Sequence, residues 1–169
     1  NTVAYYGTST LGLDLHLRGE VGTRKIGGLV YANVAASAAI SNTTAETVFD
    51  TAFTIPASSL TAGSLIRVKW QGIATATNST DTLTTRLRLG GVAGTLITNS
   101  AALDATNDDI FCGSVDIIVR TVGASGTFVA GGQSTAMGAP GTATSRARFV
   151  GSTASTTTTT QPLTLTAEW

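Results

Sequence analysis

Cysteine, histidine, proline and charged residues are all scarce in this sequence. Its 169 residues include one cysteine, Cys112, one histidine, His16, and three prolines, and only 12% of them are charged. A single cysteine forms no intramolecular disulfide, and one Cys with one His cannot complete a Cys/His zinc site. Nucleophilic catalysis needs a base beside the nucleophile, and His16 is the only conventional one. We therefore expect a protein that is not an enzyme and carries no cofactor.

The charges that are present balance. Ten basic and ten acidic residues give a formal net charge of zero, which leaves no overall electrostatic signal for nucleic acid or an anionic membrane. The long uncharged stretches 26–45 and 121–145 are rich in Gly, Ser and Thr, so they lack the apolar density of a membrane span. We expect neither a nucleic-acid nor a membrane partner. The chain opens on Asn1 and ends at Trp169 inside an expected strand, which predicts processing or a longer chain.

Threonine, alanine, glycine and serine make up more than half of the chain, a composition that favours strands and tight turns over helices. Alternation of apolar and polar residues, with Ile118 as an exception, marks four segments as half-buried strands: 65–71, 83–89, 111–120 and 163–169. We assign to the core the apolar residues Ile66, Val68, Trp70, Phe111, Ile117 and Leu165.

Weaker strand patterns cover residues 25–33, 36–41, 47–55, 94–98, 126–131 and 144–150. The intervening segments are turn-forming, among them Pro56–Gly63 (PASSLTAG), the pair Gly90–Gly91 and Gly138–Gly141 (GAPG). Strands at this spacing predict an all-β fold, an antiparallel sandwich of about eight to ten strands, with residues 25–169 forming that domain.

Residues 1–24 differ from the rest, and we interpret them as an N-terminal arm or attachment segment. They combine an aromatic pair with an alternating leucine stripe and are too short to form a core of their own. The apolar face of this arm is predicted to pack on the main domain or on another chain. The simpler alternative is that the arm is an ordinary first strand of the sandwich. The residues proposed for contact with another molecule or another protomer are Tyr5, Tyr6, Leu13, Leu15 and Leu17.

Two polar groupings have a chemical interpretation as well as a structural one. The loop 104–109 holds the oxygen ligands Asp104, Asn107, Asp108 and Asp109, which could bind Ca²⁺. It does not match an EF-hand, however, and we favour a solvated turn. Basic residues also alternate along two expected strands: Arg67, Lys69, Arg86 and Arg88. They form a basic stripe if those strands are neighbours, whereas on separate solvent faces they discourage edge pairing. Neither grouping is sufficient to assign a metal or catalytic site.

Residues 41–91 resemble a segment of structural proteins from tailed-phage virions. The matching motifs are TAETVF at 44–49, TIPASSLTAG at 54–63 and RLRLGG at 86–91, and the C-terminal PLTLTAEW is similar to the last strands of such proteins. The resemblance implies a jelly-roll-like β-sandwich, often a homotrimer, displayed on the virion. It also implies that TIPASSLTAG is the corner between the two sheets, with Pro56 outside the central ladder and Gly63 supplying a permissive backbone.

From the resemblance we expect a capsid decoration or cement protein that binds the major capsid protein or other virion proteins on the particle surface. The alternative is a receptor- or glycan-binding module of a tail fibre or spike, for which a cluster of exposed aromatic side chains is expected. A third interpretation is a secreted carbohydrate-active domain, which requires two facing carboxylates at the separation of a catalytic cleft.

Overall fold

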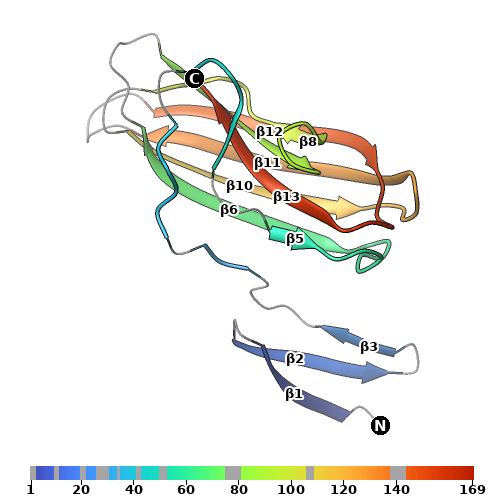
Figure 1. The fold of residues 1–169 in the computed structure, drawn as a ribbon. Helices are drawn as coiled ribbons and strands as arrows, with labels where there is room; N and C mark the ends of the chain where they lie inside the picture. Colours follow the sequence, from blue (N-terminus) through green and yellow to red (C-terminus); the bar gives the residue numbers. More distant parts are fainter. Residues whose placement is uncertain are drawn as a thin grey trace. The chain divides into compact units, whose positions relative to one another are not determined.

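The computed structural model describes residues 3–9, 12–19, 22–25, 31–33, 35–40, 43–49, 53–74, 81–105, 109–137 and 144–169, with residues 3–25 and 144–150 described through their backbone. The chain divides into two compact units, Asn1–Ala36 and Ser37–Trp169. The expected arm, residues 1–24, falls within the first unit. No helix occurs among the described residues, and the regular secondary structure of both units consists of β-strands (Figure 1).

The first unit is a small antiparallel meander. Its strands β1 (Val3–Ser9), β2 (Gly12–Gly19) and β3 (Gly22–Lys25) pair in sequence order. Because paired residues share a face of the sheet, the register places Tyr6 beside Leu15 and places Tyr5 beside His16 on the opposite face. Within the described residues, these three strands pair only with one another.

The second unit is a sandwich of two antiparallel sheets, which confirms the predicted all-β fold class (Figure 1). One sheet has the order β12-β11-β10-β6, and the other has the order β4-β13-β7-β8, with β5 also on β13 and β9 on β7. The strands of the first sheet are β6 (Leu65–Ala74), β10 (Asp109–Val119), β11 (Gly126–Met137) and β12 (Thr144–Ser155). Those of the second are β4 (Thr47–Val48), β5 (Phe53–Ile55), β7 (Thr82–Leu89), β8 (Thr95–Asn99), β9 (Leu103–Asp104) and β13 (Gln161–Glu168).

The four strongly alternating segments became β6, β7, β10 and β13, as predicted. In β7 the buried and half-buried positions alternate, and Leu83, Leu87 and Leu89 face the core. Strand β13 departs from the expected pattern, because Thr164 and Thr166 are buried, whereas Leu165 between them is only partly buried. These threonines lie on the outer face of their sheet, where part of the chain before β4 covers Thr166.

Several weaker strand predictions were wrong in extent. Residues 31–33 and 36–40 are not strands, and residues 47–55 form the two short strands β4 and β5 rather than one. Strands β11 and β12 run six and five residues, respectively, beyond the predicted ends. Glycines caused the underestimate: Gly131, Gly132 and Gly151 indicate turns in the sequence, but in the structure they lie inside paired strands.

The TIPASSLTAG segment is a corner between the sheets, as expected, because it leaves β5 in one sheet and enters β6 in the other. Pro56 directly follows β5 and so lies outside the ladder. Gly63 has φ +88°, a left-handed conformation that glycine adopts without strain. Its amide donates to the carbonyl of Val119 at 2.8 Å, which fastens the corner to the end of β10.

The core lies between the two sheets in two clusters. The larger one contains Phe128, Val115 and Ile117 from one sheet with Leu87 and Ile97 from the other. The smaller one gathers around Leu103, Leu83 and Phe111. Of the residues that the sequence assigned to the core, Phe111 and Ile117 are buried. The other four, Ile66, Val68, Trp70 and Leu165, are partly buried and pack against the clusters.

Aromatic rings cover glycines on the neighbouring strand in two places along β6 and β10. Trp70 is paired with Gly113, and Phe111 is paired with Gly72. A Cβ placed on Gly113 would lie 2.1 Å from Trp70 Cζ2, and one on Gly72 would lie 2.5 Å from the end of the Phe111 ring. Each ring therefore occupies the space that a side chain would need, so these two glycines are fixed by packing rather than by a turn.

Candidate functional site

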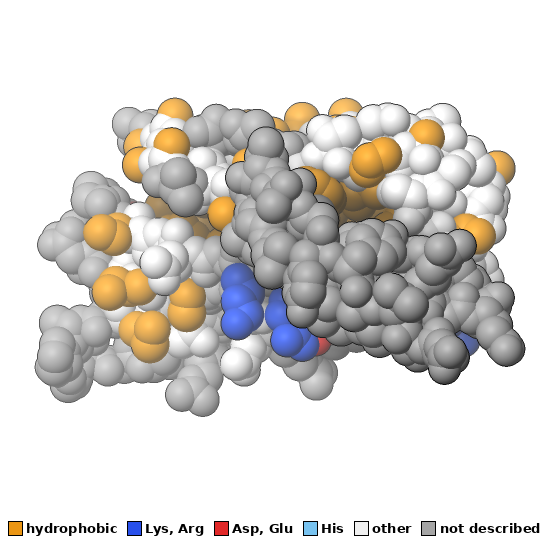
Figure 2. Space-filling view, turned by 90° about the horizontal axis from the view of Figure 1, so that it is seen from below, with side chains coloured by type: hydrophobic (Ala, Val, Ile, Leu, Met, Phe, Trp, Pro, Cys, Tyr) orange, Lys and Arg blue, Asp and Glu red, His pale blue; other side chains and the backbone are white. Residues whose placement is uncertain are grey.

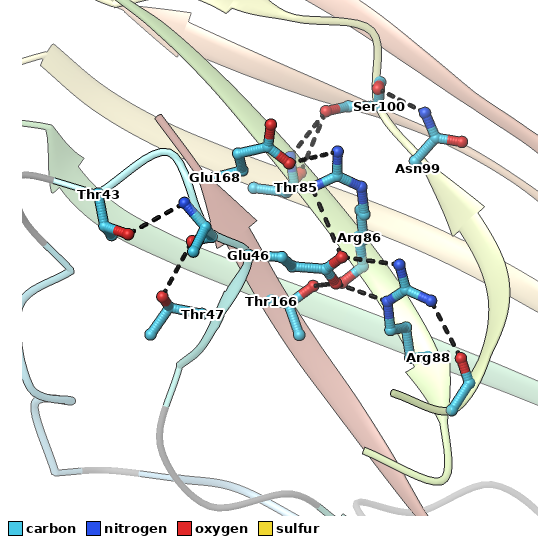
Figure 3. A network of polar contacts seen from close by, with 12 residues as sticks. Thr43, Glu46, Thr47, Thr85, Arg86, Arg88, Asn99, Ser100, Thr166 and Glu168 are labelled. Atoms are coloured by element: carbon cyan, nitrogen blue, oxygen red, sulfur yellow. Dashed lines mark hydrogen bonds and ion pairs between the residues drawn. The ribbon is translucent and has the colours of Figure 1, made fainter. Parts of the chain in front are cut away.

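The most developed polar cluster lies on the outer face of β13 and β7, and the segment before β4 completes it. Glu46 lies between the guanidinium groups of Arg86 and Arg88 (Figure 3). Arg88 donates to it through Nε at 2.5 Å and through Nη2 at 2.7 Å, while Thr166 on β13 donates its hydroxyl. The bidentate geometry is the arrangement in which arginine holds a carboxylate most strongly.

The two arginines extend the cluster to neighbouring elements. Arg86 forms an ion pair with Glu168 at 2.7 Å and lies 3.8 Å from Glu46. Arg88 also donates through Nη1 to the carbonyl of Gly94 at 3.0 Å, in the turn between β7 and β8. The side chains of Glu46, Arg86 and Arg88 are only 16–19% exposed. The cluster thus connects the segment before β4 with two strands and a turn of the same sheet.

The ionisation of Glu46 reflects this environment. Burial alone would raise the pKa of its carboxyl, but the hydrogen bonds from Arg88 and Thr166 and the charges of both arginines outweigh burial and lower the pKa below its ordinary value of 4.5. Glu46 also raises the pKa of Arg88 through the same hydrogen bond. The carboxyl of Glu46 and the guanidinium of Arg88 are therefore fixed charges at neutral pH.

The cluster is arranged to hold the chain in place. The acceptor oxygens of Glu46 are already engaged by Arg88 and Thr166, so they are not poised to take a proton from a substrate. The basic stripe proposed from Arg67, Lys69, Arg86 and Arg88 does not form, because β6 and β7 belong to different sheets. Arg86 and Arg88 are neutralised by glutamates, whereas Arg67 pairs with Asp116 on the other sheet.

The five proposed contact residues of the arm do not all share one face. The register of β1 and β2 groups Leu13, Leu15 and Leu17 with Tyr6, while Tyr5 belongs to the face of Asp14 and His16. The three leucines share a face because they alternate along β2, a pattern that the sequence already shows. The opposite placement of the two tyrosines follows from their adjacency on one strand.

The proposed calcium loop is described only at its ends. Asp104 is exposed in β9, and Asp109 is 3% exposed at the start of β10, whereas Asn107 and Asp108 lie outside the described residues. Within the described part of the chain, no group of three or more His, Cys, Asp or Glu side chains could hold a metal ion. Cys112 is a free thiol, partly exposed on β10.

A shallow crevice lies at one end of the sandwich, near the corner between the sheets. It is lined by Ile55, Leu60, Leu89, Phe128, Thr156, Thr157, Thr159 and Gln161 and has room for no more than about one water molecule. This volume is far below the ~300 Å³ at which small-molecule sites begin. The crevice is too small to be a substrate pocket.

Comparison with known proteins adds no relative. No protein-family model matches the chain, and no curated protein or solved structure is significantly similar to it. The described residues also include no helix with the length and apolar character needed to cross a membrane.

Proposed function

We propose that this chain is a non-enzymatic structural protein of a tailed-phage virion, a capsid decoration or cement protein that attaches to the assembled shell. The observation that carries the proposal is the separate N-terminal sheet with leucines grouped on one face. A three-stranded sheet of this size cannot bury an apolar face by itself. The resemblance of residues 41–91 to phage structural proteins supplies the setting.

The sandwich suits a display role. Its core extends across both sheets, and a segment preceding β4 is held on its surface by partly buried ion pairs. In the proposed mechanism, three copies assemble, and each contributes its N-terminal sheet to contact with the major capsid protein. Several weak contacts on one rigid particle then act together, so the bound state outlasts any single contact. Binding to the assembled shell stabilises it relative to its free subunits.

The alternative of a glycan-binding tail module gains no specific support. Where side chains are described, which leaves out residues 3–25 and 144–150, the exposed large hydrophobic side chains are all aliphatic or Met. Stacking of sugar rings on aromatic side chains was the feature expected of such a module. The third interpretation, a carbohydrate-active domain, requires two carboxylates that face each other across a cleft. In the cluster around Glu46, Glu46 and Glu168 are instead paired with arginines.

The first test locates the chain on particles that contain it. A cryo-EM reconstruction is expected to show density for the sandwich on the icosahedral shell, with the N-terminal sheet against capsid protein. Density confined to the tail or fibre tips would refute the decoration role and favour host recognition. Light scattering of the purified chain should give about 51 kDa for a trimer, three times the chain mass of 17.1 kDa.

A matched pair of variants tests the attachment face. Leu15 and His16 are neighbours on β2 but lie on opposite faces of the sheet. Leu15→Asp is expected to abolish recovery of the chain with particles, because it places a charge on the apolar face, whereas His16→Asp should leave recovery near wild type. Equal effects of the two variants would contradict attachment through the leucine face.

A further inference from the structure

The outer face of the β12-β11-β10-β6 sheet concentrates positive charge, although the whole chain is neutral. Strand β6 contributes Arg67 and Lys69 to this face, and Arg120 is exposed directly after β10. The register of β11 and β12 places Arg146 and Arg148 on the same face, opposite Thr135 and Gln133. We call this surface the basic face.

Among the described positions of the basic face, Asp116 is the only acid. It forms a bidentate pair with Arg67 at 2.6 and 2.7 Å, and the register places the two residues side by side on β10 and β6. The Arg67 hydrogen bond lowers the pKa of the Asp116 carboxyl, with a smaller contribution from Lys69. Three described cations and one carboxylate lie on this face, and the register adds two basic positions on β12, a formal surplus of four positive charges. On the other sheet, Glu46 and Glu168 neutralise the arginines.

Exposed aliphatic side chains flank these charges. Ile73, Ile110 and Met137 occupy one row across β6, β10 and β11, and are 70%, 51% and 41% exposed. Leu65 and Ile118 form a second row at the other end of β6, with 57% and 46% exposure. Figure 2 shows Lys and Arg side chains beside a group of hydrophobic side chains. Apolar groups in register on adjacent strands are typical of a surface that another molecule covers.

We propose that the basic face binds a partner protein that presents carboxylates flanked by apolar side chains. Charge complementarity requires an anionic partner, and the two aliphatic rows favour a protein over a sugar or phosphate polymer. The described part of the face has no aromatic side chain for stacking nucleic-acid bases, and a flat sheet does not enter a groove of duplex DNA. A second copy offering the same face is disfavoured, because four positive charges would meet four others.

The size of the face fits such a partner. Four strands spaced about 4.8 Å apart and about ten residues long cover roughly 600 Å². A protein–protein interface of standard size buries about 800 Å² on each partner. The basic face therefore supplies most of one interface, and the inference holds whether or not the chain is a virion protein.

The test measures binding of the full-length chain to labelled polymers by fluorescence anisotropy at low salt. The probes are a random glutamate–tyrosine copolymer, polyglutamate of the same length, heparin and duplex DNA. The copolymer should bind most tightly, because it alone combines carboxylates with apolar groups. Added salt should weaken its binding, because the attraction between exposed charges is screened. Tighter binding of heparin or DNA, or binding of no probe at all, would overturn the proposal.

Charge-matched variants show whether the face or the net charge is responsible. Lys69→Glu lowers the net charge by two. The control is the double variant Ala101→Glu and Ala102→Glu, which lowers the net charge by the same amount. These two exposed alanines lie in the β8–β9 connection, away from the basic face. Lys69→Glu should weaken copolymer binding about tenfold, and the double variant should retain it. Equal losses would refute the proposal. Ile73→Ser should reduce the preference for the copolymer over polyglutamate, and an unchanged preference would refute the role of the aliphatic rows.

Discussion

Gly113→Ala tests whether the tryptophan–glycine pair between β6 and β10 is fixed by packing. An ideal Cβ at residue 113 would lie 2.1 Å from Trp70 Cζ2, whereas carbon atoms in contact are about 3.5–4.0 Å apart. The ring must then move by roughly 1.5 Å, and it packs against both core clusters. Overpacking of this kind costs about 1–3 kcal/mol of unfolding free energy. Without the clash, alanine in a strand would stabilise by about 0.5–1 kcal/mol relative to glycine.

The sign of the change therefore decides the question. We expect Gly113→Ala to lower the melting temperature by about 3–10 °C, measured by calorimetry together with urea unfolding. Ser114→Ala, the next residue along β10, should change the unfolding free energy by less than about 0.5 kcal/mol. On a Trp70→Leu background the clash is absent, so Gly113→Ala should cost nothing further. A stabilised Gly113→Ala protein, or the same cost on both backgrounds, would refute the reasoning.

Three further predictions concern the second unit. Glu46→Gln should lower the unfolding free energy by about 1.5–3 kcal/mol in urea titrations at pH 7, because it removes the charged acceptor of Arg88. The pKa of Glu46 is lower in the folded than in the unfolded chain, so its carboxylate contributes fully to stability above pH 4.5 and loses that contribution as the pH falls through the folded pKa. Glu46→Gln should therefore flatten the acidic part of the curve of stability against pH. An unchanged curve would contradict this role of Glu46. Leu103→Ala, which empties a fully buried position, should cost about 2–5 kcal/mol by the same titration, and a cost near zero would show that the smaller cluster does not contribute to the core. Arg67→Ala should leave the melting temperature unchanged despite its short ion pair, because the pair is exposed to solvent, and a clear drop would assign the pair a structural role.

Much of the fold was visible in the sequence because period-2 alternation survives wherever one face of a strand is solvated. It correctly identified β6, β7 and β10, whose outer faces carry exposed or half-exposed polar residues. Strand β13 obeyed the period but not the burial, since a distant segment lies over its outer face and Thr166 bonds to Glu46, 120 residues away. A local pattern contains no information about such a long-range contact.

The polar cluster around Glu46 escaped sequence reasoning for the same reason. Arg86 and Arg88 are conspicuous in the sequence, but their partners come from separate segments, at Glu46 before β4 and Glu168 at the end of β13. The basic face was missed because net charge averages over the chain, whereas a sheet sorts charges by strand order. Arg148 and Lys69 are distant in sequence but occupy the same row of one sheet, three strands apart.

Strand β6 ends its sheet, and within the described residues it pairs only with β10. On the side of β6 away from β10, no described strand pairs with its backbone. An unpaired strand edge is the kind of template on which strands from other molecules grow into fibrils. Arg67 and Lys69 are the third and fifth residues of β6. A second copy approaching edge to edge would bring its own two cations toward them, and this repulsion opposes polymerisation when many copies are crowded together.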